Sequence, residues 1–175
     1  MMKNVVKITS GTLRGRAITT PGGKTHPMGE RERLALFNMI ADAVPGAVVL
    51  DAYAGSGALG IEALSRGARA VVFVEKSSGA ARVINENLQS LGIDGEVVTA
   101  KIPDYEPNTL FDVVLADPPY DSFNLTEVAQ LGKYVNKNGI LVLSHPGEAP
   151  EIPGTILRKS HKYAGATISI YDKSN

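Results

Sequence analysis

Short apolar runs alternate with helix-like segments along most of this 175-residue chain. Strands that alternate with helices of about 10 to 15 residues form βαβ units, in which the strands are parallel and helices cover both faces. We therefore predict an α/β, Rossmann-like fold with a mostly parallel, seven-stranded sheet. The predicted central order is strand 47–51, helix 57–66, strand 70–75, helix 78–91, strand 95–99, strand 111–116, helix 124–135 and strand 139–144.

Both ends of the chain depart from this alternation. Residues 155–163 and 166–172 are β-rich and joined by Ala164-Gly165, which predicts an antiparallel hairpin at the edge of the sheet. Residues 5–10 and 16–20 predict a second hairpin. A helix follows, ended by Pro45-Gly46, whose apolar face is formed by Leu34, Phe37, Ile40, Ala41 and Val44. We expect one domain, 1–175, with an extension at 1–45 and a core at 46–175.

The strand at 47–51 runs into a glycine-rich turn. Gly55 and Gly57 have no β-carbon, so the backbone can approach a ligand closely. Glu75 ends the next strand about 20 residues later, where an acidic residue can accept both hydroxyls of a ribose. A nucleoside-like cofactor is therefore predicted here, with the candidate contacts Asp51, Tyr53, Ala54, Gly55, Ser56, Gly57, Glu75 and Lys76.

These residues also have plainer interpretations. The glycines could serve only close packing of a helix on a strand, and Asp51 could brace the loop instead of touching the cofactor. Tyr53 could be a packing aromatic residue. A nicotinamide-binding site is a further alternative, although the glycine spacing fits it only loosely.

Asp117-Pro118-Pro119-Tyr120 directly follows the apolar run at 111–116. This order predicts a rigid turn at the carboxyl end of a buried strand, where open α/β sheets bind their ligands. The turn offers a carboxylate, carbonyls that the prolines leave unpaired, and an aromatic face. These groups suit a flat base with an exocyclic amino group, although a purely structural turn is the alternative.

Charge is unevenly distributed in a chain whose net charge is zero. Residues 1–33 hold seven cations and two carboxylates, a net +5, so the remainder carries −5. A basic segment on an acidic body favours contact with a polyanion, because phosphate attraction depends on local charge. The alternative is an ordinary solvated surface.

Other classes are excluded by composition. The chain has no cysteine, so disulfides, thiolate zinc sites and cysteine-bound iron–sulfur clusters are absent. The three histidines lack ligand spacing, so no metal is expected. No apolar stretch approaches the roughly 20 residues of a membrane span, and the first residues are too few and too polar for a signal peptide. We expect a cytoplasmic protein with no membrane partner.

The ordered set of motifs resembles the class I S-adenosylmethionine-dependent methyltransferases of the amino-methylating branch. More narrowly, it is similar to the bacterial family that methylates N2 of a guanine in 16S ribosomal RNA. The segments that carry this resemblance are Gly11-Thr12-Leu13-Arg14-Gly15-Arg16, Arg31-Glu32-Arg33-Leu34-Ala35-Leu36-Phe37-Asn38, and Asp51 to Gly60 with Glu62-Ala63-Leu64-Ser65-Arg66-Gly67-Ala68.

The resemblance implies S-adenosyl-L-methionine as cofactor and small-subunit ribosomal RNA as partner, within a 30S particle or an assembly intermediate. It implies catalytic roles for Asp117, Pro118, Pro119 and Tyr120, with Asp117 also near the cofactor. A small enzyme without an added RNA-binding domain would rely on ribosomal proteins to shape its target. Candidate RNA contacts are Arg14, Arg16, Arg31, Arg33 and Asn38.

The sequence departs from the family pattern at two places. Before the first helix the family usually has Arg-Pro-Thr-Thr/Ser-Asp-Arg-Val-Arg, whereas this chain has His26-Pro27-Met28-Gly29 followed by 30–33. After the third strand an acidic or polar residue commonly binds the adenine amino group, whereas this chain has Ala100-Lys101-Ile102. Either Asp104 or the backbone of Ile102 could replace it.

Other functions remain open at this stage. A DNA adenine- or cytosine-amino methyltransferase usually needs a target-recognition domain, for which 175 residues leave no room. A protein-glutamine methyltransferase typically has Asn where Asp117 stands. A non-catalytic nucleotide-binding protein of ribosome assembly would keep the fold without the chemistry.

Overall fold

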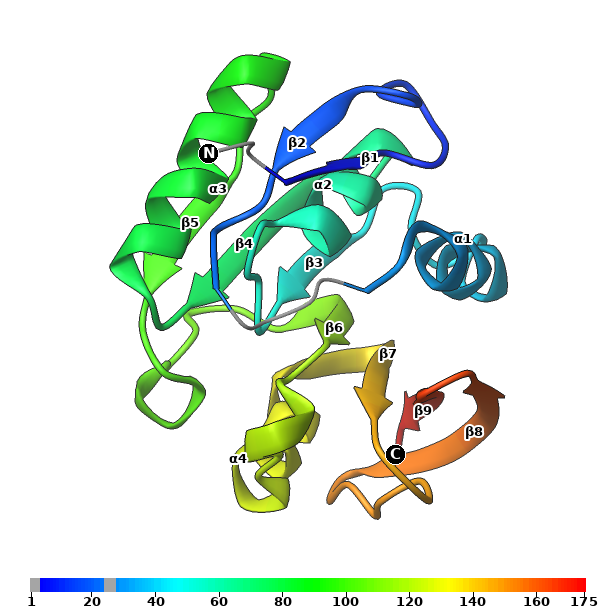
Figure 1. The fold of residues 1–175 in the computed structure, drawn as a ribbon. Helices are drawn as coiled ribbons and strands as arrows, with labels where there is room; N and C mark the ends of the chain where they lie inside the picture. Colours follow the sequence, from blue (N-terminus) through cyan, green and yellow to red (C-terminus); the bar gives the residue numbers. More distant parts are fainter. Residues whose placement is uncertain (1–3, 24–27) are drawn as a thin grey trace.

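The computed structural model describes residues 4–23 and 28–175. It confirms the predicted α/β fold, a seven-stranded sheet that is parallel except at its carboxyl-terminal hairpin (Figure 1). The strand order is β5-β4-β3-β6-β7-β9-β8. The strands are β3 (Val48–Asp51), β4 (Ala70–Glu75), β5 (Glu96–Thr99), β6 (Phe111–Ala116), β7 (Val135–His145), β8 (Thr155–Tyr163) and β9 (Ala166–Lys173).

Helices cover both faces of this sheet. On one face, α1 (Glu30–Met39), α2 (Ala58–Ser65) and α3 (Ser78–Leu91) pack against alternate strand residues such as Val49 and Val113. On the other, α4 (Leu125–Ala129) packs against the intervening residues such as Leu50 and Val114. Successive side chains of a strand point to opposite faces, so two apolar layers hold the sheet between them.

The topology places a crevice between β3 and β6. From β3 the chain moves outward through β4 to β5, then returns to lay β6 on the other side of β3. Two neighbouring strands therefore send their following loops in opposite directions. Such a switch point is where open α/β sheets bind ligands.

The amino-terminal extension forms a separate two-stranded antiparallel sheet, β1 (Val5–Lys7) with β2 (Ala17–Thr19). Both strands are shorter than expected, because the segment between them leaves the hairpin to contact α2. Thr12 N donates to Ser65 O at 2.8 Å, and a β-carbon on Gly11 would lie 1.9 Å from that same oxygen. Gly11, at φ +83°, thus allows the close approach.

Two sequence expectations need correction. In α1 the buried residues are Arg33, Leu36 and Phe37, whereas Leu34, placed on the apolar face, is 40 % exposed. Ala41 is also exposed, because the helix ends at Met39 and a turn follows. The predicted helix 124–135 is only α4 and a 3-10 turn over Gln130–Tyr134, since Val135 already pairs with Phe111.

Gly60 lies where α2 crosses β4, and a β-carbon there would come within 2.3 Å of the buried Phe73 ring. Overpacking a core costs about 1–3 kcal/mol, and the better helix propensity of alanine returns only about 1 kcal/mol. We therefore expect Gly60→Ala to lower the free energy of unfolding, measured in urea. A β-carbon on Gly79 in α3 would meet only Ser77 Oγ, at an ordinary contact distance of 3.8 Å, so Gly79→Ala is the matched control and should slightly raise stability. A stabilised Gly60→Ala would contradict this packing.

Candidate active site

A cavity of about 790 Å³ opens at the switch point, at the carboxyl ends of β3, β4, β5 and β6. Its volume lies in the range of sites for small molecules. Both sequence motifs line it, together with part of the amino-terminal extension. The lining residues used below are Thr20, Pro21, Gly22, Met28, Arg33, Tyr53, Ala54, Gly55, Ser56, Glu75, Lys76, Lys101, Ile102, Asp117, Pro118, Pro119 and Tyr120.

The glycine turn brings backbone directly to this cavity. Gly55 and Gly57 adopt φ of +55° and +83°, which side chains rarely tolerate, and α2 begins just after Gly57. A β-carbon on Gly55 would meet nothing within 4 Å, so this residue faces open space. The turn therefore presents bare backbone to the cavity at Gly55, whereas Gly57 lies outside the lining, where a β-carbon would meet Ile84, Ile61 and Phe73.

Asp51 lies beneath the turn and is fully buried. Its Oδ2 accepts a hydrogen bond from Gly60 N at 2.9 Å, so Asp51 braces the turn against α2. Its Oδ1 has no partner among the residues described. Burial raises the pKa of Asp51 to about 7, the Gly60 bond opposes this rise, and the charges of Asp117 and Glu75 add to it.

Glu75 at the end of β4 is held by two backbone donors. Its Oε2 accepts from Gly55 N at 2.9 Å and its Oε1 from Ser77 N at 2.8 Å. The carboxylate thus joins the glycine turn to the start of α3, and it remains partly exposed in the cavity wall. Lys76 beside it is exposed, so a cation also lies at this end of the cavity.

The segment after β5 supplies the next part of the wall. Ile102 lines the cavity and is buried, whereas Asp104 is exposed and lies outside the lining. Of the two alternatives, only Ile102 therefore lines the cavity, and its contact with an adenine stays a prediction. Tyr53 also lines the cavity, and its buried hydroxyl has no partner in the described part of the chain.

The turn at 117–120 closes the opposite wall. Asp117 directly follows β6, and burial raises its pKa to about 6 while the neighbouring Ser144 hydroxyl opposes the rise. A carboxyl with this pKa is mostly ionised at neutral pH. The hydroxyl of Tyr120 bonds to Ser144 Oγ on β7, which fixes the tyrosine ring at the cavity wall.

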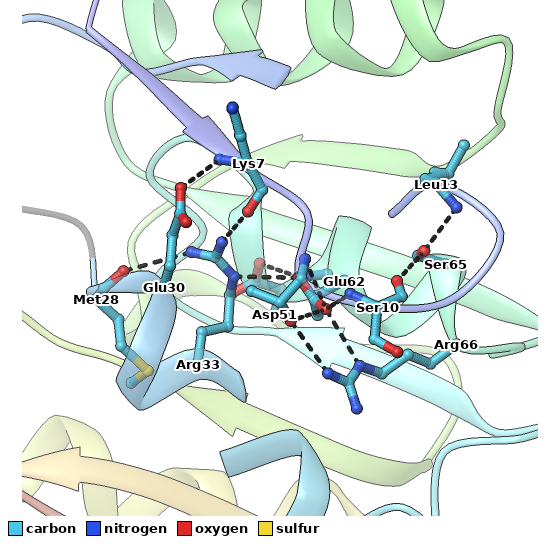
Figure 2. A network of polar contacts seen from close by, with 12 residues as sticks. Lys7, Ser10, Leu13, Met28, Glu30, Arg33, Asp51, Glu62, Ser65 and Arg66 are labelled. Atoms are coloured by element: carbon cyan, nitrogen blue, oxygen red, sulfur yellow. Dashed lines mark hydrogen bonds and ion pairs between the residues drawn. The ribbon is translucent and has the colours of Figure 1, made fainter. Parts of the chain in front are cut away.

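Figure 2 shows a polar network that joins the extension to α2. Its centre is Glu62, fully buried, whose carboxylate accepts from the backbone N–H groups of Thr9 and Ser10 and from Arg33 Nε and Arg66 Nε at 3.0–3.2 Å. Arg33 also donates to the carbonyl oxygens of Lys7 and Met28. A single buried carboxylate thus holds the hairpin and α1 on the face of α2.

This network corrects the role expected for Arg33. The sequence places it among exposed RNA contacts, but its side chain has no exposed surface and is ion-paired to Glu62. Its guanidinium is committed to Glu62, Lys7 and Met28. Arg33 therefore positions the cavity wall from inside the protein and does not face RNA.

The other basic candidates lie outside the cavity lining. Arg16 donates to Ser90 O at the end of α3, and Arg14 lies in the hairpin loop that contacts Ser65 at the end of α2. Both helices start at the cavity rim and run away from it, so these arginines lie toward the opposite rim. Arg31 and Asn38 are exposed on α1, as expected. RNA contact by these four residues stays a prediction.

Sequence reasoning missed three parts of the site. Glu62 was noted only within a motif, although a glutamate amid apolar helix residues is a signal for a buried partner. Ser144 carries no local signal, because only the pairing of β6 with β7 brings it to Asp117 and Tyr120. The wall from Thr20, Pro21 and Gly22 depends on how the extension docks.

Asp51→Asn tests the buried carboxyl. Because the folded pKa of about 7 exceeds the ordinary 3.8, wild-type protein loses stability as pH rises from about 4 to about 7, where the folded state must ionise this group. The amide cannot ionise. We therefore expect Asp51→Asn to gain stability relative to wild type as the pH rises. The difference in free energy of unfolding, variant minus wild type, should increase by at most about 4 kcal/mol between pH 4 and pH 8. Urea unfolding at both pH values measures it, and a difference independent of pH would contradict the burial.

In the described ranges 4–23 and 28–175, no helix is long and apolar enough to cross a membrane. Nor does this part of the chain bring three or more histidine or carboxylate side chains together as metal ligands. The lining of the cavity includes the strand-end carboxylates of Glu75 and Asp117 and the rings of Tyr53 and Tyr120.

Comparison with known proteins identifies relatives over nearly the whole chain. The family model described as Conserved hypothetical protein 95 matches residues 6–172. Ribosomal RNA small subunit methyltransferase D of Haemophilus influenzae is 37% identical over 137 residues, 73% of this chain and 69% of that protein.

Solved structures share the fold. A putative methyltransferase from Escherichia coli superposes with a TM-score of 0.88 at 27% identity, covering 97% of this chain and 98% of that one. A 16S rRNA N2 methyltransferase of Thermus thermophilus, solved with AdoMet and guanosine, has a TM-score of 0.75 at 18% identity, covering 98% of this chain and 50% of its own, and shows the fold alone. The resemblance inferred from sequence is confirmed: the chain belongs to the Conserved hypothetical protein 95 family and is a class I methyltransferase related to ribosomal RNA small subunit methyltransferase D.

Proposed function

We propose that this protein transfers a methyl group from S-adenosylmethionine to the exocyclic N2 amino group of a guanine in small-subunit ribosomal RNA. One observation carries the proposal: the glycine turn with Glu75 and the Asp117–Tyr120 turn line the same cavity. The name of the H. influenzae relative supports ribosomal RNA as the substrate class. The T. thermophilus protein was solved in complex with AdoMet and guanosine.

The cavity fits the proposed donor. Gly55 leaves room where a side chain would intrude, and the Glu75 carboxylate suits ribose hydroxyls. The orphaned Oδ1 of Asp51 is an acceptor beneath the turn that a ligand N–H or a bridging water would satisfy. The backbone of Ile102 would meet the adenine edge.

The sulfonium cofactor supplies an already activated methyl group, which passes to the amine nitrogen as the sulfur–carbon bond breaks. The protein's own task is to orient the amine and exclude water. An aryl-type amine is a poor nucleophile, because its lone pair is delocalised into the ring. In the proposed complex the N–H groups of the amine donate hydrogen bonds to the Asp117 carboxylate and to the Pro118 carbonyl. These two bonds favour a pyramidal nitrogen with an available lone pair.

Two further features suit a base in this place. The Tyr120 ring, fixed through Ser144, offers a stacking surface beside Asp117. Asp117, with a pKa of about 6, holds its charge at neutral pH and can accept the proton that the methylated amine releases. Because a stacked base cannot reach such a cavity, we propose a loop nucleotide or a flipped one, within a 30S particle or an assembly intermediate.

Asp117→Ala should abolish methyl transfer, because it removes the acceptor that orients the amine. Transfer is measured with tritiated donor on small-subunit particles, naked RNA, DNA and protein, which also separates the substrate classes. Donor binding by calorimetry should be largely retained. In wild type, turnover should rise with pH through about 6 as Asp117 ionises. Undiminished turnover of the variant would remove the assigned role.

Glu75→Gln should weaken donor binding by about 10-fold or more. The amide cannot accept from both Gly55 N and Ser77 N as the carboxylate does, and it offers the ribose a weaker acceptor. Calorimetric dissociation constants measure the effect. Glu86→Gln, an exposed glutamate of α3 outside the cavity lining, is the matched control and should bind donor normally. Equal affinities for both variants would count against the ribose contact.

A further inference from the structure

The rim of the sheet at which the cavity opens also has a basic surface, on β8, which the sequence analysis did not predict. Strand β8 carries Arg158, Lys159 and Lys162 and no carboxylate. As the last strand of the sheet it has a neighbour on one side only, and its seven central residues are exposed. The extension, which holds the basic excess of the sequence, instead directs Arg14 and Arg16 toward the opposite rim.

Strand register connects β8 to the Asp117–Tyr120 turn. Ser144, whose hydroxyl bonds to Tyr120, pairs with Ile168 on β9, and Ile168 pairs with His161 on β8. Directly paired residues project to the same face of a sheet, and neighbouring strands lie about 4.8 Å apart. His161 therefore lies about 10 Å from Ser144, on the face that carries the tyrosine contact.

Lys159 and Tyr163 share this face with His161, because they lie two residues before and after it. The rings of His161 and Tyr163 have centroids 5.4 Å apart, and Tyr163 packs on the core. Arg158 is paired with Asp172, and Lys162 lies 3.4 Å from Glu148. Lys159 has no carboxylate partner among the residues described, so its charge is available to a ligand.

We infer that Lys159, His161 and Tyr163 form a binding surface for the RNA strand that flanks the target base. The inference rests on the proposed function and names where that substrate continues beyond the cavity. Lys159 neutralises a phosphate, while His161, held against Tyr163, stacks on an unpaired base. Alternating cationic and aromatic groups are the pattern that single-stranded nucleic acid requires.

The same charges argue against a second copy of this chain as the occupant. Edge-to-edge pairing of two β8 strands would bring together Lys159 of both copies, which has no carboxylate partner among the residues described, whereas Arg158 and Lys162 are already paired with Asp172 and Glu148. Lysines on an edge strand oppose such pairing. A polyanion is the partner whose charge complements this edge.

The test uses the full chain and small ribosomal subunits, which carry the RNA in its particle, from cells that lack this gene. Lys159→Ser should raise the KM for RNA about 5- to 10-fold, with kcat and donor affinity unchanged. It should also reduce by about 0.7 the magnitude of the slope of the logarithm of the RNA-binding constant against the logarithm of the salt concentration. His161→Ala should raise KM about 5-fold without changing that slope, since stacking involves no counterion release. Lys137→Ser is the matched control: this exposed lysine lies at the start of β7, at the other end of the sheet, and its loss should change neither quantity.

Each other outcome overturns the inference in a distinct way. If wild type methylates RNA and both β8 variants match it in KM and salt slope, the surface is not used and the proposed function stands. If wild type binds donor but methylates no RNA, the proposed function fails and this surface fails with it. If the β8 variants alter only the sedimentation of the protein, the edge is an interface between copies.

Discussion

A single buried carboxylate, Glu62 on α2, connects the amino-terminal extension to the rest of the molecule. It has no exposed surface and receives N–H donors from Thr9, Ser10, Arg33 and Arg66. An uncompensated charge in this place would cost several kcal/mol, so its partners must all be present together. Thr9 follows strand β1 and Arg33 lies in α1. If either the hairpin or α1 separated from α2, the Glu62 carboxylate would lose part of its hydrogen bonding.

This constraint reaches the cavity through α2. The helix begins at the glycine turn, where Gly60 N bonds to Asp51, and Glu62 lies two residues further along. The extension held by Glu62 in turn supplies Met28 and Arg33 to the cavity lining. The glycine turn and this part of the cavity wall are therefore both held in place by the same short helix, α2.

The sequence predicted what depends on strand periodicity and failed where position depends on docking. Glu75 and Asp117 line one cavity because each stands at the carboxyl end of a parallel strand, and parallel strands share a rim. Asp51, at the end of β3, lies buried beneath the glycine turn and outside the lining. The apolar face of α1 was misjudged because an arginine can be buried when a glutamate meets it, which periodicity does not reveal. The basic hairpin, whose contact with RNA stays a prediction, is held toward the other rim by contacts with Ser65 and Ser90. No local pattern encodes those contacts.

In the proposed function, the contact with the substrate amine and the contacts with the flanking RNA strand lie on different strands of the sheet, and there is a physical reason for this separation. Asp117 must sit in a poorly solvated place, and burial there already raises its pKa to about 6. A lysine brought against it would lower that pKa and compete for the carboxylate, weakening its bond to the substrate amine. Three strands further along, β8 is exposed, so in the proposed function a cation there would reach phosphate without entering the cavity. The antiparallel hairpin extends the sheet beyond the cavity, so in the proposed function the cation that would contact the RNA backbone stays apart from the carboxylate that would contact the base.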